Sequence, residues 1–339
     1  MIPLATYRFH RTVIYGFVLL FEVVGLFGNI NLVVLIVRKK ALRTKYGYIL
    51  ATLATLHTLC LLYELVDMAF SVAATFFAYE IHRDACFLAL FPYIFFNSLQ
   101  TGTMWVLALD LLITTLFPLR SRKFHLPSYL LYLFILPVIY GITTVISGFI
   151  TLDKETLFIC NPPIALSKAV RAQWYYIMTM FTVLTIVFYS LAFVLIYFKA
   201  HRPGSDIRYL DRKALKTLKY LIFLFVLLRC ITVTITSTLI ALDVDKDVAD
   251  VVQSYNIIFG VTAYSQNAYV CYFRSYEYRM LLRDQISRIH PKLERFLPKL
   301  GEMSTSGQQG NRSTVVSVLT KTAKMKNSRK MKNKINNVN

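Results

Sequence analysis

The sequence predicts an all-α membrane protein: a bundle of seven transmembrane helices with an amphipathic eighth helix and the N-terminus outside the cell. Three observations lead to this fold class. The chain of 339 residues is 56% hydrophobic and only 17% charged, whereas soluble domains carry about 25% charged residues. Its apolar residues gather in seven long blocks. Its lysines and arginines are unevenly divided between the segments that separate these blocks.

Each apolar block exceeds the roughly 20 residues that a helix needs to cross a bilayer. The blocks are also too long to be buried strands of a soluble core. If the chain were a soluble helical protein, the length of all seven apolar blocks would be unexplained. In chain order they are 13–37, 47–70, 86–117, 129–152, 174–198, 218–242 and 251–273.

The blocks divide the chain into four predicted regions. These are an extracellular N-terminus (1–12), a seven-transmembrane domain (13–273), a membrane-surface helix (274–297) and a disordered basic cytoplasmic tail (298–339). The first block follows Arg8 and Arg11, but it is too long for a signal peptide and has no small-residue cleavage site. We therefore expect it to remain as an uncleaved anchor.

The orientation follows from the positive charges. With the N-terminus outside, the inner segments hold 30 of the 38 lysines and arginines and the outer segments hold 7. Cytoplasmic loops of membrane proteins carry this excess of positive charge. The net charge of +20 therefore indicates membrane topology and attraction to anionic lipid, and not binding to nucleic acid.

Two of the five cysteines lie in outer segments. Cys86 is at the outer end of the third block and Cys160 lies between the fourth and fifth blocks, whereas the other three are within helices. Only Cys86 and Cys160 share an oxidising compartment, so we expect a disulfide between them, the alternative being two free thiols.

Several motifs at helical positions resemble those of rhodopsin-like G-protein-coupled receptors. The stretch "GLFGNINLVVLIVRKKALRTKYGYILATLATLHTL" places Asn29 at the asparagine of their first helix and His57 where their second helix has an aspartate. Asp110 comes 24 residues after Cys86 and matches their Asp-Arg-Tyr motif. "NAYVC", which begins at Asn267, occupies the place of their Asn-Pro-x-x-Tyr motif.

Within that superfamily the chain resembles the nematode serpentine chemoreceptors of the srsx class, over about residues 15 to 282. The stretches that carry the resemblance are "RKKALRTKYGYILATLATLHTLCLLYEL", "ACFLALFPYIFFNSLQTGTMWVLALDLLITTLFPLRSR" and "NAYVCYFRSYEYR". The resemblance implies a plasma-membrane receptor of a sensory cell. Such a receptor binds an external small molecule within the bundle and signals to a heterotrimeric G protein at its inner face.

The chain departs from the superfamily in its signalling motif, which we assign to Asp110, Leu111 and Asn267. Leucine stands at the position of the motif arginine, and Leu112 at that of the tyrosine. The last three predicted helices contain no proline, although proline commonly kinks a helix. We therefore expect weak or absent coupling to the G protein, the alternative being that leucine is tolerated and other residues of the inner face carry the coupling.

A candidate ligand pocket lies in the outer half of the third block. Tyr93, Asn97 and Gln100 follow the spacing i, i+4, i+7 and share one helix face, which lines the pocket in the superfamily. The alternative is that the two amides only hydrogen-bond between helices. We also assign Arg229 and Tyr255 to this predicted ligand site.

Arg229 lies about ten residues into the sixth block, near the middle of the membrane. An unpaired charge at this depth is costly. We expect an ion pair with Glu64, in preference to Glu22, or else a role as counter-charge for an anionic ligand. Asp67 is expected closer to the surface.

Asn29, His57 and Asn267 fall at similar depth by the resemblance and are predicted to form a polar network. Neutral His57 brings no negative charge, which argues against the sodium ion found there in relatives. No cluster of His, Cys, Asp or Glu has the spacing of metal ligands, so neither a metal nor a cofactor is expected.

No catalytic motif is present, so the chain is not predicted to be an enzyme. The alternative from another class is a seven-span transporter or ligand-gated channel. The sequence shows neither an inverted repeat nor a pair of helices broken by Gly or Pro, which are typical of transporters.

Residues 274–297 alternate apolar residues with arginines, a pattern typical of a helix on anionic lipid. Residues beyond 298 are rich in Ser, Thr, Gly and Asn and end in a basic segment. This composition predicts disorder.

Overall fold

The computed structural model describes residues 4–77, 79–157, 160–200, 220–232, 234–235, 238 and 246–289. The chain forms two units, Met1–Leu282 and Arg283–Asn339, and only the first seven residues of the second are described. The predicted tail, most of the loop after residue 200 and much of the second half of the sixth block lie outside the described residues.

The first unit is a bundle of long helices, which confirms the predicted all-α membrane fold. Five helices are long and apolar enough to cross a membrane: α1 (Leu4–Arg38), α2 (Lys45–Phe77), α3 (Arg83–Leu116), α5 (Leu126–Ile150) and α7 (Lys168–Ala200). The segment Tyr220–Thr232 forms a shorter apolar helix. The helix α9 (Lys246–Arg274) has the length of a span but is more polar than these five.

Short elements connect or follow the long helices. They are the 3-10 helix η1 (Lys40–Leu42), β1 (Ile81–His82), α4 (Pro118–Lys123), β2 (Thr156–Leu157), α6 (Pro162–Ala165) and α10 (Tyr276–Ile289). The helix α1 begins before the predicted start of its membrane block at residue 13. A helix already nucleated in the membrane extends at little cost.

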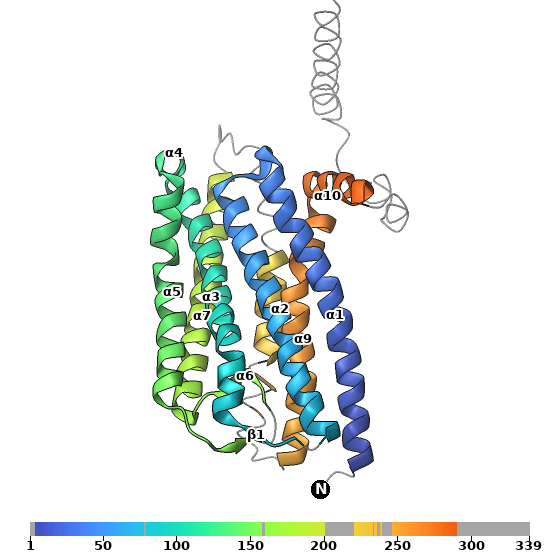
Figure 1. Cartoon of the computed structure of the whole chain (residues 1–339). Helices are drawn as coiled ribbons and strands as arrows, with labels where there is room; N and C mark the ends of the chain where they lie inside the picture. Colours follow the sequence, from blue (N-terminus) through green and yellow to red (C-terminus); the bar gives the residue numbers. More distant parts are fainter. Residues whose placement is uncertain are drawn as a thin grey trace, which may run out of the picture. The chain divides into compact units, whose positions relative to one another are not determined.

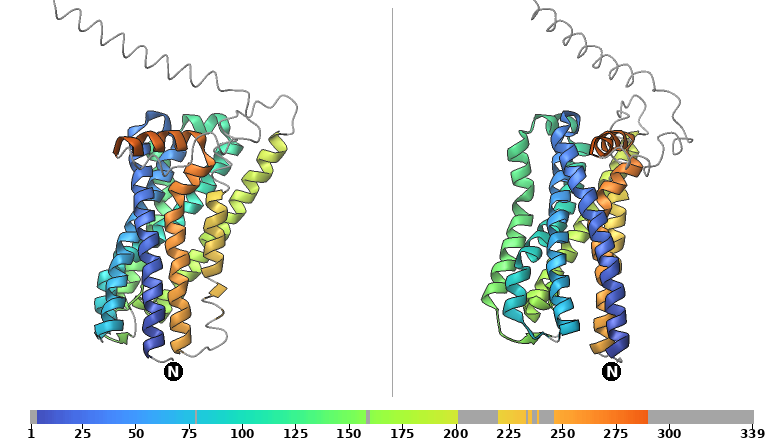
Figure 2. Two further views of the ribbon diagram at one scale, coloured as in Figure 1. Left: turned by 90° about the vertical axis from the view of Figure 1, so that its right-hand side faces the viewer. Right: turned by 45° about the vertical axis from the view of Figure 1, so that its right-hand side comes forward.

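The helix α3 lies at the centre of the bundle. It packs against α2, α5, α6 and α7, while α1 packs against α2 and α9 (Figure 1). Figure 2 shows α1 and α9 side by side along their lengths. Because α3 contacts four other helices, its side chains form much of the bundle interior. Phe87 and Trp105 are two of these core side chains.

One end of the bundle, which we call the disulfide end, carries the N-terminus, β1 and α6 (Figure 1). Cys86 and Cys160 form a disulfide with a Cα–Cα distance of 5.5 Å, which confirms the predicted bond. β1 and β2 pair antiparallel beside it. Arg83 adds ion pairs to Asp153 and, at 2.6 Å, to Glu155. These contacts fasten the segment after α5 to the beginning of α3.

The contact between α3 and α5 depends on a glycine. A Cβ atom added to Gly102 would lie 2.5 Å from the Cβ of Pro137 and 3.1 Å from its Cα. A proline ring on the facing backbone cannot rotate away. Small residues commonly allow such close approach of membrane helices.

We predict that Gly102→Ala lowers the thermal stability of the purified receptor. Overpacking costs about 1–3 kcal/mol and exceeds the gain of about 1 kcal/mol from replacing a helical glycine by alanine. The matched control is Gly16→Ala on α1, because a Cβ there meets nothing within 4 Å. Thermal unfolding measurements compare the two variants, and equal midpoints would contradict the close helix contact.

Candidate functional site

A cavity of about 120 Å³ lies within the half of the bundle at the disulfide end. Side chains of α2, α3, α6, α7, the helix Tyr220–Thr232 and α9 line it. Sites for drug-sized ligands usually measure about 300–1,000 Å³. This cavity is smaller than such sites, so it suits a molecule smaller than a typical drug.

Two of the predicted ligand residues on α3 line this cavity and one does not. Tyr93 and Asn97 are cavity residues. Gln100 is completely buried away from the cavity, and its amide has no hydrogen-bond partner in the described part of the chain. Tyr255 also lies outside the lining, and its hydroxyl is 2.9 Å from Nδ1 of His10.

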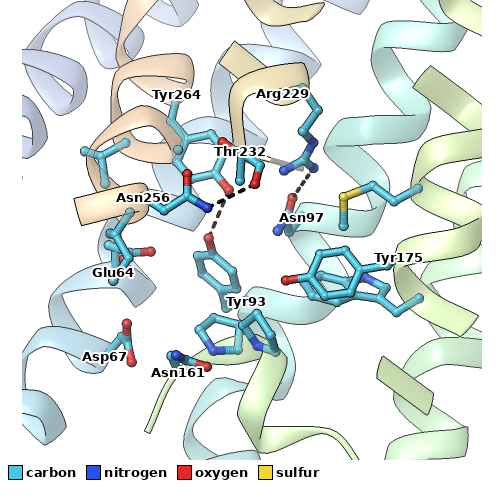
Figure 3. Close-up of a pocket in the computed structure, with 17 residues that line it drawn as sticks. Glu64, Asp67, Tyr93, Asn97, Asn161, Tyr175, Arg229, Thr232, Asn256 and Tyr264 are labelled. Atoms are coloured by element: carbon cyan, nitrogen blue, oxygen red, sulfur yellow. Dashed lines mark hydrogen bonds between the residues drawn. The ribbon is translucent and has the colours of Figure 1, made fainter. Parts of the chain in front are cut away.

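Arg229 lines the cavity and contacts α3 (Figure 3). One terminal nitrogen of its guanidinium donates to Oγ1 of Thr101 at 2.9 Å and to Oδ1 of Asn97 at 3.3 Å. Its Nε is buried without a partner among the described residues. The guanidinium lies 5.9 Å from the ring centroid of Phe225.

The expected ion pair between Arg229 and Glu64 is wrong for this structure. Among the described residues Arg229 forms no ion pair with Glu64 or Glu22, and it is bound instead by the neutral groups of Asn97 and Thr101. Figure 3 shows the reason, because the cavity separates Arg229 from Glu64. Arg229 projects toward the adjacent α3, and the acid projects from α2.

The acids gather on the other side of the cavity. Glu64 and Asp67 lie one turn apart on α2, and both are buried and line the cavity (Figure 3). Asp67 lies nearer the disulfide end of α2 than Glu64, as expected, and it is only 3% exposed. Behind them on α1, Glu22 is 1% exposed, and its two carboxyl oxygens have no hydrogen-bond partner within the described residues.

The segment after Cys160 closes part of the cavity. Asn161 and Pro162 line it, and Oδ1 of Asn161 accepts a hydrogen bond of 2.9 Å from the Ile164 N–H at the start of α6. Asparagine followed by proline is a typical helix start. The sequence therefore contained a signal for this short helix. Its position beside the cavity could not be read from that signal, because the helix is held against α3 by the disulfide of the preceding Cys160.

A polar network continues from the cavity toward the opposite end. The hydroxyls of Tyr93 and Tyr264 are 2.9 Å apart. The backbone carbonyl of Tyr264 accepts a hydrogen bond of 2.9 Å from Nδ2 of Asn29. Nδ2 of Asn267 lies 2.8 Å from Nδ1 of His57, whose ring centroid is 5.5 Å from that of Tyr264. The structure thus brings the three predicted network residues together around Tyr264, which sequence reasoning did not identify.

The described residues include no group of three His, Cys, Asp or Glu side chains that could hold a metal ion.

Asp110 lies at the far end of α3 from the disulfide and is 6% exposed. Its Oδ1 accepts a hydrogen bond of 2.7 Å from the hydroxyl of Tyr129 on α5. Lys45 lies over the same ring, with Nζ 4.4 Å from its centroid, and donates to the carbonyl of Ser121. A phenol and a nearby ammonium therefore surround this buried acid.

The loop cations Arg120 and Lys123 form no ion pair with Asp110 in the part of the chain that is described. The nearest donor comes instead from α5, which packs against α3 along its length. Leu111 is partly buried and packs against the apolar core. Leu111 therefore takes part in packing and provides no polar contact.

We predict that Tyr129→Phe destabilises the receptor by about 1–3 kcal/mol, because it leaves the buried Asp110 without its donor. Tyr132→Phe is the control, since Tyr132 lies on the same helix and is 74% exposed. Adding Asp110→Leu to Tyr129→Phe should recover part of the loss, because the unpaired polar group is then removed. Thermal unfolding of the purified variants measures these effects. Equal stability of Tyr129→Phe and Tyr132→Phe would refute the role of the hydrogen bond.

Comparison with known proteins identifies one family. The family described as serpentine type 7TM GPCR chemoreceptor Srsx matches residues 22–286. The matched region contains the whole cavity, the polar network and Asp110. A search of curated proteins finds no match.

Proposed function

Because the chain belongs to the Srsx family of serpentine-type seven-transmembrane G-protein-coupled chemoreceptors, we propose that it binds an external small molecule in the cavity and signals to a heterotrimeric G protein. The chain is a multi-pass membrane protein of a chemosensory receptor family. We place it in the plasma membrane of a sensory cell, with the disulfide end outside. A disulfide fits this orientation because the extracellular side is oxidising.

The observation that carries the proposal is a cavity whose polar groups lack partners. The Nε of Arg229 and Oδ1 of Asp67 are buried and have no hydrogen-bond partner in the described structure, and both residues line the cavity. An unsatisfied buried polar group costs about 1–3 kcal/mol. A ligand that provides the missing partners recovers this cost, so it binds favourably.

The polar network offers a physical route from the cavity toward the G-protein side. Tyr93 lines the cavity and forms a hydrogen bond with the hydroxyl of Tyr264. Tyr264 in turn accepts a hydrogen bond from Asn29 through its carbonyl, and its ring packs against His57. A ligand that interacts differently with two arrangements of these side chains shifts the balance between them. At the other end, a G protein would contact Asp110, the 118–123 segment and the 199–217 loop, and anionic lipid would contact the arginines of α10.

The proposal is tested by a ligand screen on cells that express the receptor with a promiscuous G protein. A dose-dependent response that disappears in Asn97→Ala, but persists in a variant at the lipid-facing Ile142, supports binding in the cavity. The alternative of a transporter or ligand-gated channel is tested in cells that lack G proteins. Ligand-evoked uptake or current in those cells would replace the receptor proposal.

We predict weak G-protein activation by the native chain and a gain of coupling in Leu111→Arg. In relatives the arginine at this position pairs with the preceding acid at rest and contacts the G protein when active. Leucine does neither, and the loss of a coupling contact acts directly on signalling. The measurement is G-protein activation at matched surface expression.

The control for this prediction is Leu112→Arg, which adds the same charge one residue further along α3. Its side chain points about 100° away around the helix. Equal and robust ligand-dependent signalling from the native chain and from Leu111→Arg would show that the arginine is unnecessary here. Equal gains from both arginine variants would indicate a general effect of positive charge.

A further inference from the structure

The charges that line the cavity are divided between its two sides. Glu64 and Asp67 project from α2 on one side, and Arg229 projects from the helix Tyr220–Thr232 on the other (Figure 3). Both acids are buried, at 4% and 3% exposure. None of the three forms an ion pair with another described residue. The cavity therefore separates charges of opposite sign that do not neutralise each other directly.

From this arrangement we infer that the ligand is a small zwitterion, with its cationic group toward Glu64 and Asp67 and its anionic group toward Arg229. The inference rests on the proposed function and names the chemical class that the cavity accepts. A cavity of about 120 Å³ favours a compact molecule. A compact amino acid-like molecule has this size and both charges.

Ligands with a single charge fit this cavity less well. A simple anion would pair with Arg229 but would face two acids across a narrow space. A simple cation would pair with the acids and leave Arg229 with only its neutral partners Asn97 and Thr101. Each mismatch leaves one side of the cavity without a ligand group of complementary charge, which weakens binding. A zwitterion compensates both sides at once.

The aromatic lining between the two sides agrees with this assignment. The ring of Tyr93 lies between the acids and Arg229, and Tyr175 lies on the Arg229 side (Figure 3). Aromatic faces attract cations, so the Tyr93 ring is suited to an ammonium group that approaches the acids. Its hydroxyl is already oriented by Tyr264 at 2.9 Å.

The test measures thermal unfolding of the full-length purified receptor with defined probes. The zwitterions are glycine, β-alanine, γ-aminobutyrate and δ-aminovalerate. For each, the carboxylate and the primary amine of the same chain length serve as single-charge controls. At least one zwitterion should raise the unfolding midpoint in a saturable way, and its two single-charge controls should bind at least about tenfold more weakly. A series in which no zwitterion raises the midpoint overturns the assignment, as does one in which a single-charge control binds as tightly.

Variants test each side of the cavity. Arg229→Gln, Glu64→Gln and Asp67→Asn should each weaken zwitterion binding about tenfold or more, because each removes a charge-assisted contact. Arg229→Lys keeps the charge and should retain the preference for zwitterions even where Arg229→Gln folds poorly. Lys168→Gln is the control, because Lys168 is an exposed cation at the disulfide end. Unchanged binding in both acid variants would overturn the inference.

The outcome is separable from that of the proposed function. If the ligand screen finds a neutral or singly charged agonist that requires Asn97, the receptor function holds and the zwitterion assignment fails. If zwitterions bind in the cavity but evoke uptake or current without a G protein, the ligand class holds and the receptor proposal fails.

Discussion

The absence of water from the hydrocarbon region is the constraint on which this structure depends. Every polar group at membrane depth must find its partner inside the bundle. The hydroxyl of Tyr129 provides that partner for Asp110, and Asn267 provides it for His57. These bonds join α3 to α5 and α2 to α9, so the polar side chains also fix which helices are neighbours.

At the cavity this constraint is not fully met within the described residues. Asp110 has a donor, whereas Asp67 and Arg229 at the cavity keep atoms without partners, as do Glu22 and Gln100 outside its lining. Such groups are costly for the empty protein and favourable for a ligand that completes them. The disulfide at Cys86 holds the segment that covers these groups, so structure and binding depend on the same contacts.

The sequence predicts most of the fold and part of the site, and the limits are physical. Length and apolar composition identify the spans, and a shared compartment identifies Cys86 and its partner. Helical spacing identifies one face of α3, but Gln100 lies roughly 10 Å deeper than Tyr93 on that face, away from the cavity. The depth of a residue along its helix is readable from the sequence, whereas the depth to which a cavity between helices extends is not. The partners of Arg229 and of Asp110 therefore appear only in the structure.

The central claim is that a ligand can reach the cavity from the disulfide end of the bundle. It is tested most directly by thiol accessibility, in a chain that keeps the Cys86–Cys160 bond and has its free cysteines at positions 60, 230 and 271 replaced. Ile257→Cys places a thiol in the cavity lining, and Ile142→Cys places one on the lipid-facing side of α5. A membrane-impermeant thiol reagent added outside the cell should label the first and not the second. Labelling of neither, or of both equally, would contradict the account.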